Sequence, residues 1–89
     1  MSLSGPTQIA VTSLLFAQLQ EYVGAGKVVV SVAEGSTGRD LIRCFATRHP
    51  AAEGLLAVSR LAVNCEYASE DVVLRDGDEV AVIPPVSGG

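Results

Sequence analysis

The sequence predicts an α+β fold, in which one sheet of four to five strands packs against one main helix. Three observations lead to this prediction. Val-rich segments with the two-residue alternation of strands lie near both ends of the chain. A stretch with helical periodicity lies between them. No repeat, linker or shift of composition divides the 89 residues, and this length suits one small domain.

We expect the folded domain to occupy residues 8–83. Residues 1–7 are predicted to be a disordered lead or a remnant of cloning, because they are polar and rich in breakers. Residues 84–89 are predicted to be a flexible tail that ends in two glycines.

The first half of the domain is predicted to contain two tightly joined strands. Alternation in residues 8–16 builds one side-chain row in which Ser13 interrupts three apolar residues, Ile9, Val11 and Leu15. Phe16 then points to the opposite face. Residues 17–23 are expected to form a short helical turn ended by Gly24-Ala25-Gly26, which is too short for a phosphate-binding loop. Residues 27–33 form the second strand.

The middle of the chain is predicted to be the main helix. Thr37 is a suitable N-cap, and Asp40 lies three residues later near the positive end of the helix. Pro50 ends the helix just after His49, so His49 is interpreted as a helix-terminal residue rather than a catalytic one. One helical stripe is apolar: Leu41, Ile42, Cys44, Phe45. Residues 51–59 are expected to form a helical turn and a loop.

The second half is predicted to return to strands. Residues 60–67 alternate as a third strand, 68–71 form a turn, and 72–74 form a short edge piece. Asp76-Gly77 is a turn signal before the terminal strand, in which Val80 and Val82 alternate with Ala81 and Ile83. Pro84 and Pro85 end that strand because neither can donate a ladder hydrogen bond.

Composition excludes several classes of function. The net charge is −4 and no basic cluster exists, so the sequence predicts no nucleic-acid binding. No apolar run is long enough to span a membrane, and no signal peptide is evident. Two cysteines make no disulfide framework, so we expect a reduced, cytoplasmic protein.

The tail invites a chemical interpretation. Fully extended, its six residues would reach about 20 Å at ~3.3 Å per residue. Gly88 and Gly89 lack Cβ atoms and can enter a narrow channel. The terminal carboxyl is the reactive group at the tip, with a usual pKa of about 3.5, so at neutral pH it is an unreactive carboxylate. Acyl chemistry therefore requires prior activation, for instance as an adenylate.

Four segments together resemble the small, sulfur-carrier subunit of molybdopterin synthase. They are Leu-Leu-Phe-Ala-Gln at 14–18, Thr-Arg-His-Pro at 47–50, Ala-Val-Asn at 62–64, and Asp-Gly-Asp-Glu-Val-Ala-Val-Ile-Pro-Pro-Val-Ser-Gly-Gly at 76–89. The resemblance covers residues 9–89, and the terminal motif is its most specific part. It implies the ubiquitin-like β-grasp fold, with a mixed sheet. Ser13 departs from the family, which usually has an apolar residue there.

The resemblance also implies a mechanism and a set of partners. An adenylyltransferase related to ubiquitin-activating enzymes would adenylate Gly89 with ATP, and a sulfur donor protein would convert it to a thiocarboxylate. The tail, comprising Pro84, Pro85, Val86, Ser87 and Gly88, would insert into the large synthase subunit, in a heterotetramer. Sulfur would pass to a cyclic pyranopterin monophosphate bound mainly by that subunit. This chain would bind no cofactor of its own and would not be catalytic alone.

The remaining candidate residues have structural interpretations. Cys44 and Cys65 lie on apolar stripes, so we expect both in the core rather than in a redox relay. The acidic residues at 70–71 and 76–79 are interpreted as a solvated face, and no metal site is predicted. Phe16 and Ile83 fall on the strand face turned away from the helix. They are either ordinary sheet residues or contacts with the large subunit.

Two alternative functions stay open. The chain could carry sulfur for thiamine thiazole formation or tRNA thiolation. It could also be a ubiquitin-like modifier joined to lysines through Gly89. Activation of the terminal carboxyl is common to all three functions, and Pro-Pro-Val-Ser before Gly-Gly favours the synthase.

Overall fold

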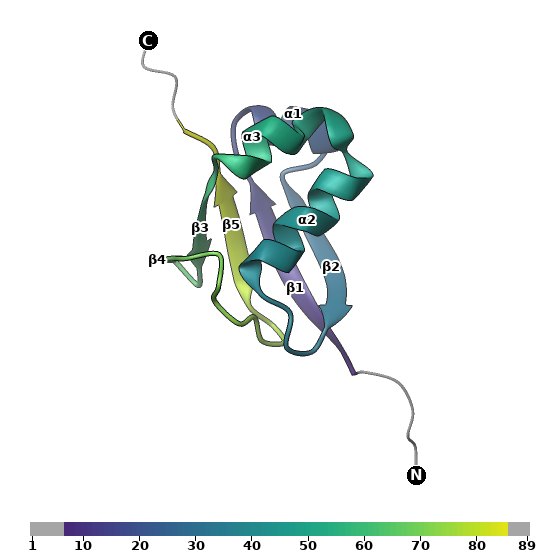
Figure 1. Cartoon of the computed structure of the whole chain (residues 1–89), viewed down its shortest axis with the longest axis vertical. Helices are drawn as coiled ribbons and strands as arrows, with labels where there is room; N and C mark the ends of the chain where they lie inside the picture. The colour runs from purple at the N-terminus through teal and green to yellow at the C-terminus, as the bar shows by residue number, and fades with distance from the viewer. Residues whose placement is uncertain (1–6, 86–89) are drawn as a thin grey trace.

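The computed structural model describes residues 7–85, and these form one five-stranded sheet with the main helix packed across one face (Figure 1). The elements in chain order are β1 (Gln8–Leu15), α1 (Gln18–Val23), β2 (Lys27–Ala33), α2 (Gly38–Arg48), the 3-10 helix η1 (Pro50–Ala52), α3 (Glu53–Ala57), β3 (Arg60–Val63), β4 (Glu66–Ala68) and β5 (Glu79–Ile83).

The sheet is mixed, with strand order β2-β1-β5-β3-β4. β1 and β5 are parallel neighbours at its centre, and the three other pairings, β1 with β2, β5 with β3 and β3 with β4, are antiparallel. The first and last strands therefore lie side by side although some seventy positions separate them in the chain. The predicted fold class, an α+β domain with a mixed sheet and one main helix, is confirmed.

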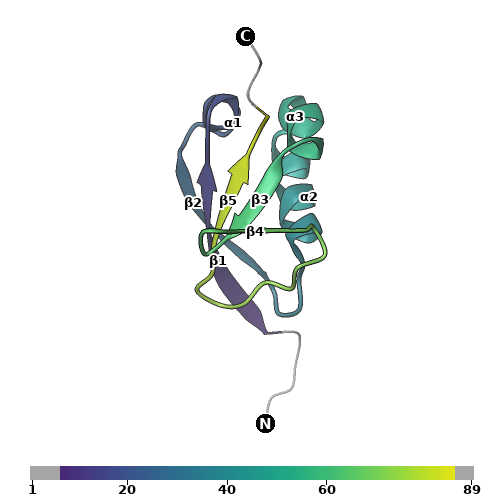
Figure 2. The same cartoon turned by 90° about the vertical axis from the view of Figure 1, so that its left-hand side faces the viewer.

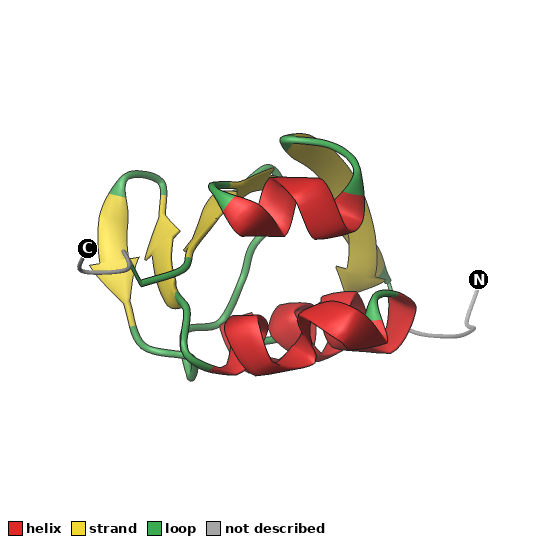
Figure 3. Cartoon of the chain, turned by 90° about the horizontal axis from the view of Figure 1, so that it is seen from above, coloured by secondary structure: helices red, strands yellow, loops and turns green. Residues whose placement is uncertain are grey.

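The core lies between the sheet and α2. Figure 2 shows α2 and α3 along one face of the sheet and α1 at one end of the strands, and Figure 3 shows from above that α1 lies apart from the other two helices. Buried side chains from both layers meet there: Val11, Leu15, Leu41, Phe45, Leu56, Leu61, Val80, Val82. We call the other side of the sheet the open face. Alternation assigns it these residues: Thr12, Leu14, Lys27, Val29, Arg60, Ala62, Tyr67, Glu79, Ala81, Ile83.

The N-terminus of α2 carries the capping box that the sequence predicts. The Asp40 backbone N–H donates to Thr37 Oγ1 at 3.3 Å, and the Thr37 backbone N–H donates to Asp40 Oδ2 at 2.9 Å. The hydrogen bond from that backbone N–H lowers the pKa of the Asp40 carboxyl, because it favours the charged form. Arg39 pairs with Glu70 at 3.4 Å and with Asp71 at 2.9 Å, which ties this end of α2 to the segment after β4.

The prediction of one strand over residues 60–67 is wrong. β3 ends at Val63, and a turn follows in which Asn64 and Cys65 have φ values of 51° and 73°. The chain then reverses into β4. Cys65 is exposed at this turn, so its predicted place in the core is also wrong, because the reversal removes it from the apolar row. Cys44 is partly buried and packs against the core.

Two further boundaries differ from the sequence prediction. Residues 72–74 form no edge strand; Val73 makes an isolated bridge to Thr37, and Leu74 is buried. β1 ends at Leu15, so Phe16 begins the connection to α1 rather than ending the strand. Residues 50–57 form η1 and α3, which agrees with the predicted helical turn.

Ser13 is an apparent defect in the core. Its side chain is fully buried among the core residues of β1, and its hydroxyl has no hydrogen-bond partner in residues 7–85. A buried polar group without a partner costs about 1–3 kcal/mol.

We therefore expect Ser13→Ala to raise the free energy of unfolding by about 1 kcal/mol, because it removes the unsatisfied oxygen and leaves only a small void. Urea denaturation measures the change. The matched control is Ser31→Ala on β2, which removes an exposed hydroxyl that donates to Gln8 Oε1 at 3.2 Å, and it should change stability by less than about 0.5 kcal/mol. Equal effects of the two variants would contradict the assignment.

Candidate functional site: the exit of the C-terminal strand

β5 delivers the C-terminal segment from the middle of the sheet. Hydrogen-bonded neighbours flank it on both sides, β1 with Leu15 beside Val82 and β3 with Arg60 beside Ile83. Its last residues point toward the end of the domain where α1 and α3 lie (Figure 1). A strand held on both sides cannot swing, so the direction in which the chain leaves the sheet is fixed.

Of the predicted tail residues, only the two prolines are described. Pro84 is buried and Pro85 is exposed. Val86, Ser87, Gly88 and Gly89 lie outside the described residues. The prediction of a flexible inserting tail therefore stays a prediction for these four.

Hydrogen bonds from the loop before β5 set its register. Asp76 Oδ1 accepts from the Ala10 backbone N–H at 2.8 Å, and Asp78 Oδ2 accepts from the Arg75 backbone N–H at 2.8 Å. Asn64 Nδ2 donates to Asp78 Oδ1 at 2.9 Å, and Asn64 Oδ1 accepts from the Glu79 backbone N–H at 3.0 Å. Asn64 suits this place because asparagine tolerates positive φ.

These bonds change the interpretation of the acidic segment. Two of its carboxylates, Asp76 and Asp78, organise the turn that starts β5, whereas the sequence had suggested a solvated face, free or touching a partner. Among residues 7–85, no three His, Cys, Asp or Glu side chains gather in a way that could hold a metal ion.

The two predicted interface residues lie at the same end of the sheet. The parallel register sets Leu15 beside Val82, and Phe16 and Ile83 each follow one of these two residues. Phe16 is 46% exposed, and Ile83 is half-buried on the open face. Both therefore border the point where the chain leaves the sheet.

An apolar band crosses the open face next to this exit. Strand register aligns Leu14 on β1, Ala81 on β5, Ala62 on β3 and Tyr67 on β4. The Tyr67 side chain is 70% exposed. Leu14 and Ala81 are half-buried and Ala62 is buried, so Tyr67 supplies most of the exposed apolar surface of this band.

Sequence reasoning missed Arg60 and Tyr67. The alternation of one strand over residues 60–67 would put Tyr67 in one row with Leu61. The turn at Asn64 and Cys65 pairs Tyr67 with Ala62 instead, which moves it to the open face. The Arg60 guanidinium carbon lies 5.7 Å from the centre of the Tyr67 ring, within the range of a cation–π contact. The available signal was Asn64, because asparagine favours turns and here it interrupts an apparent strand.

The other residues singled out in the sequence have local structural roles. His49 is the C-cap of α2, and its backbone N–H donates to the Phe45 carbonyl oxygen at 2.8 Å. Gly24 ends α1 with a φ of 88°, as expected for the glycine turn. None of the helices within residues 7–85 has the length and hydropathy needed to cross a membrane.

Comparisons with known proteins agree on one family. The model of the ThiS family matches residues 13–89. The molybdopterin synthase sulfur carrier subunit of Dictyostelium discoideum is 42% identical over 79 residues, which cover 85% of this chain and 92% of that protein. The protein of the same name from Chlamydomonas reinhardtii is 36% identical over 78 residues, covering 85% of this chain and 94% of the relative.

Among solved structures, the crystal structure of SAMP1 from Haloferax volcanii superimposes with a TM-score of 0.79. It is 32% identical in sequence, and the match covers 90% of this chain and 99% of that chain. This likeness identifies the fold as the ubiquitin-like β-grasp that the resemblance implied.

Proposed function

This chain belongs to the ThiS family and is a sulfur carrier of the molybdopterin synthase type, and on that premise we propose that it carries its sulfur as a thiocarboxylate on Gly89. The observation that carries the proposal is the exit of β5. The central strand of the sheet ends at Ile83, and after it Pro84 is buried and Pro85 is exposed.

The chemistry begins with activation of the terminal carboxylate. A carboxylate oxygen of Gly89 attacks the α-phosphorus of ATP, and pyrophosphate leaves. The resulting acyl adenylate has a good leaving group, AMP. Sulfur at the sulfide level, supplied by a donor protein, then attacks the acyl carbon and displaces AMP. The product is a covalent sulfur carrier that divides a difficult sulfur insertion into easier steps. An adenylyltransferase related to ubiquitin-activating enzymes would catalyse the first step.

Sulfur transfer requires a partner because of the length of the tail. Residues 85–89, fully extended, span about 16 Å at ~3.3 Å per residue. At that distance from the exit, the side chains of the β-grasp domain cannot act on the sulfur. The name of the relatives, a subunit of molybdopterin synthase, points to a larger subunit that supplies the missing groups.

We therefore propose that the tail enters the large subunit of a heterotetrameric synthase. Phe16 and Ile83 would contact that subunit around the exit, and Gly88 and Gly89 would pass a narrow channel. Basic residues of the large subunit would hold the phosphate of a cyclic pyranopterin monophosphate, which receives two sulfur atoms as a dithiolene. This chain would be a sulfurtransferase subunit without activity alone and without a cofactor of its own. It would work in the cytoplasm, where Cys44 and Cys65 stay reduced.

Reconstitution tests the proposal. The chain is incubated with the adenylyltransferase, ATP and a sulfide source, and intact mass is expected to rise by the exchange of one oxygen for one sulfur. The thiocarboxylated chain is then mixed with the large subunit and the pyranopterin precursor, and dithiolene product is assayed. Product is expected with the thiocarboxylate and none with the carboxylate form. Equal yields from the two forms would overturn the proposal.

A second candidate function has one specific observation in its favour, the likeness to SAMP1 of Haloferax volcanii. The chain could be joined through Gly89 to lysines of other proteins, or it could serve a second sulfur pathway such as thiamine thiazole formation or tRNA thiolation. Isopeptide adducts on many proteins, detected by mass spectrometry after mild denaturation, would support the modifier.

A further inference from the structure

Two cations lie on the open face, one on each side of its apolar band. Lys27 on β2 is paired in register with Leu14, and Arg60 on β3 is paired with Ile83. Both side chains are exposed. Since the whole chain has a net charge of −4, cations at both borders of this face are a local reversal of charge.

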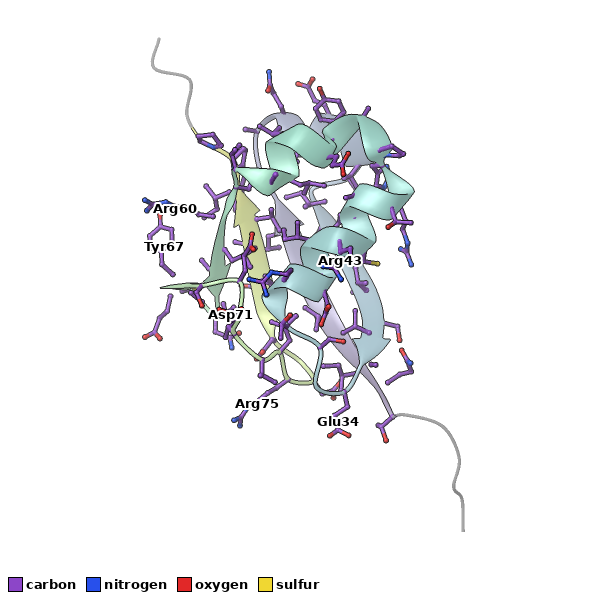
Figure 4. All side chains as sticks on the ribbon, viewed as in Figure 1. Glu34, Arg43, Arg60, Tyr67, Asp71 and Arg75 are labelled. Atoms are coloured by element: carbon purple, nitrogen blue, oxygen red, sulfur yellow. The ribbon has the colours of Figure 1, made fainter. Side chains whose placement is uncertain are left out.

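The described residues leave both cations without an acidic partner. The two ion pairs found within residues 7–85 both belong to Arg39, on the opposite side of the sheet. Arg60 lies against Tyr67 at the edge of β3 and β4, and Figure 4 shows the two side chains next to each other. The ring restricts the guanidinium without neutralising it, so its donors stay available to another molecule.

A hollow adjoins Arg60 at the edge of the sheet. Leu61 and Ala68 provide apolar walls, and Ser59 and Ser69 add polar lining. Glu70 also lines the hollow, but it pairs with Arg39. The site can accept the stem of a partner's acidic side chain while the carboxylate reaches Arg60, a pairing that arginine favours.

The root and the tip of the C-terminal tail are expected to present opposite charges to a partner. Arg60 lies beside Ile83 at the root of the tail, and Lys27 lies two strands away at the same end of the sheet. The tip would carry a carboxylate or thiocarboxylate about 16 Å from the root when the tail is extended at ~3.3 Å per residue. A complementary partner is therefore acidic around the mouth of its channel and basic at the depth where the tip arrives. A surface that is basic throughout would repel the root.

We propose that Lys27 and Arg60 select the large synthase subunit by pairing with carboxylates that border an apolar patch at the mouth of its channel. The inference rests on the proposed function, in which the large subunit binds a pterin phosphate and therefore needs basic residues deep in its channel. Charges at the border of an interface act mainly on the association rate and on specificity.

Charge reversal tests the inference. Lys27→Glu and Arg60→Glu are each expected to weaken binding to the large subunit roughly tenfold at low salt, mainly through slower association, and the double variant more. The loss should shrink as salt rises, because screening acts over about 8 Å at 0.15 M ionic strength. Surface plasmon resonance over a salt series measures this, and urea denaturation verifies the fold of each variant.

The matched control is Arg43→Glu. Arg43 is exposed on α2, on the other side of the domain, and Figure 4 shows it there. It should change affinity less than about twofold. A folded Arg60→Glu chain that binds as tightly as the wild type would overturn the inference, and so would an equal loss for Arg43→Glu.

The experiment separates this inference from the proposed function. Wild-type thiocarboxylated chain is assayed for dithiolene formation in the same preparation. If the wild type gives product but the charge-reversed variants bind as tightly as the wild type, only this inference is overturned. If the wild type gives no product, the proposed function is overturned. Loss of adenylation with intact binding to the large subunit would assign the cations to the activating enzyme and also overturn the inference.

Discussion

Removal of Gly89 is expected to abolish sulfur transfer and to leave folding unchanged. The shortened chain still ends in a carboxylate, but that group stops about 3.3 Å short of the reacting position in the adenylyltransferase and in the large synthase subunit. Reacting atoms must approach to about 3–3.5 Å, so one residue of misplacement is enough to prevent reaction. Thiocarboxylate formation, read from intact mass, and dithiolene yield should both fall by at least about a hundredfold.

Two controls accompany this deletion. The urea midpoint should equal that of the wild type, because the core residues all lie between Ile9 and Val82. Gly89→Ala keeps the length and the carboxyl but adds a methyl group, so it should be activated and then fail in the narrow channel. Full turnover by the chain that lacks Gly89 would show that the terminal residue has no role. Full turnover by Gly89→Ala would refute only the narrow channel.

Ile83→Asp is expected to weaken binding to the large subunit by about a hundredfold or more, equal to roughly 2.7 kcal/mol. Ile83 is the last residue of β5, half-buried on the open face beside the exit. In the complex, the introduced carboxylate would be taken from water into an apolar contact without a partner, which is costly. Titration calorimetry with the purified large subunit measures the loss.

A second substitution and a matched control keep this result interpretable. Phe16→Asp probes the same contact at a more exposed residue, where the fold tolerates the change, and it should lose affinity in the same direction. Val73→Asp introduces the same charge at a residue that is 56% exposed in the segment before β5, at the end of the strands opposite the exit, and it should bind within about twofold of the wild type. Folded Ile83 and Phe16 variants that bind like Val73→Asp would remove both residues from the interface.

The sequence correctly predicted those parts of the fold that depend on residue patterns over a few positions. The alternation in β1 and β5 placed their core faces correctly, apart from the hydroxyl of Ser13. Thr37 and Asp40 lie three residues apart, and their capping box is complete at that spacing. Pro50 and Gly24 end helices because of the backbone geometry that each imposes or permits.

The errors lie where a local pattern has two solutions. Residues 60–67 alternate as one long strand would, and a hairpin with a two-residue turn satisfies the same alternation while reversing the chain. Only pairing with β5 decides between them, since Asn64 bonds to Glu79 and Asp78, 15 and 14 positions later. The placement of Cys65 and Tyr67 was wrong for this reason.

By itself, the sequence determined that this chain is one α+β domain whose terminal strand ends at two prolines, because strand alternation, helix caps and prolines act over a few residues. Only the tertiary structure decided that the first and last strands are parallel neighbours at the centre, and that Arg60, Tyr67 and Lys27 share the open face of the sheet. The physical reason is that strand register joins residues distant in the chain, and it is selected by burial of the whole core rather than by any local segment.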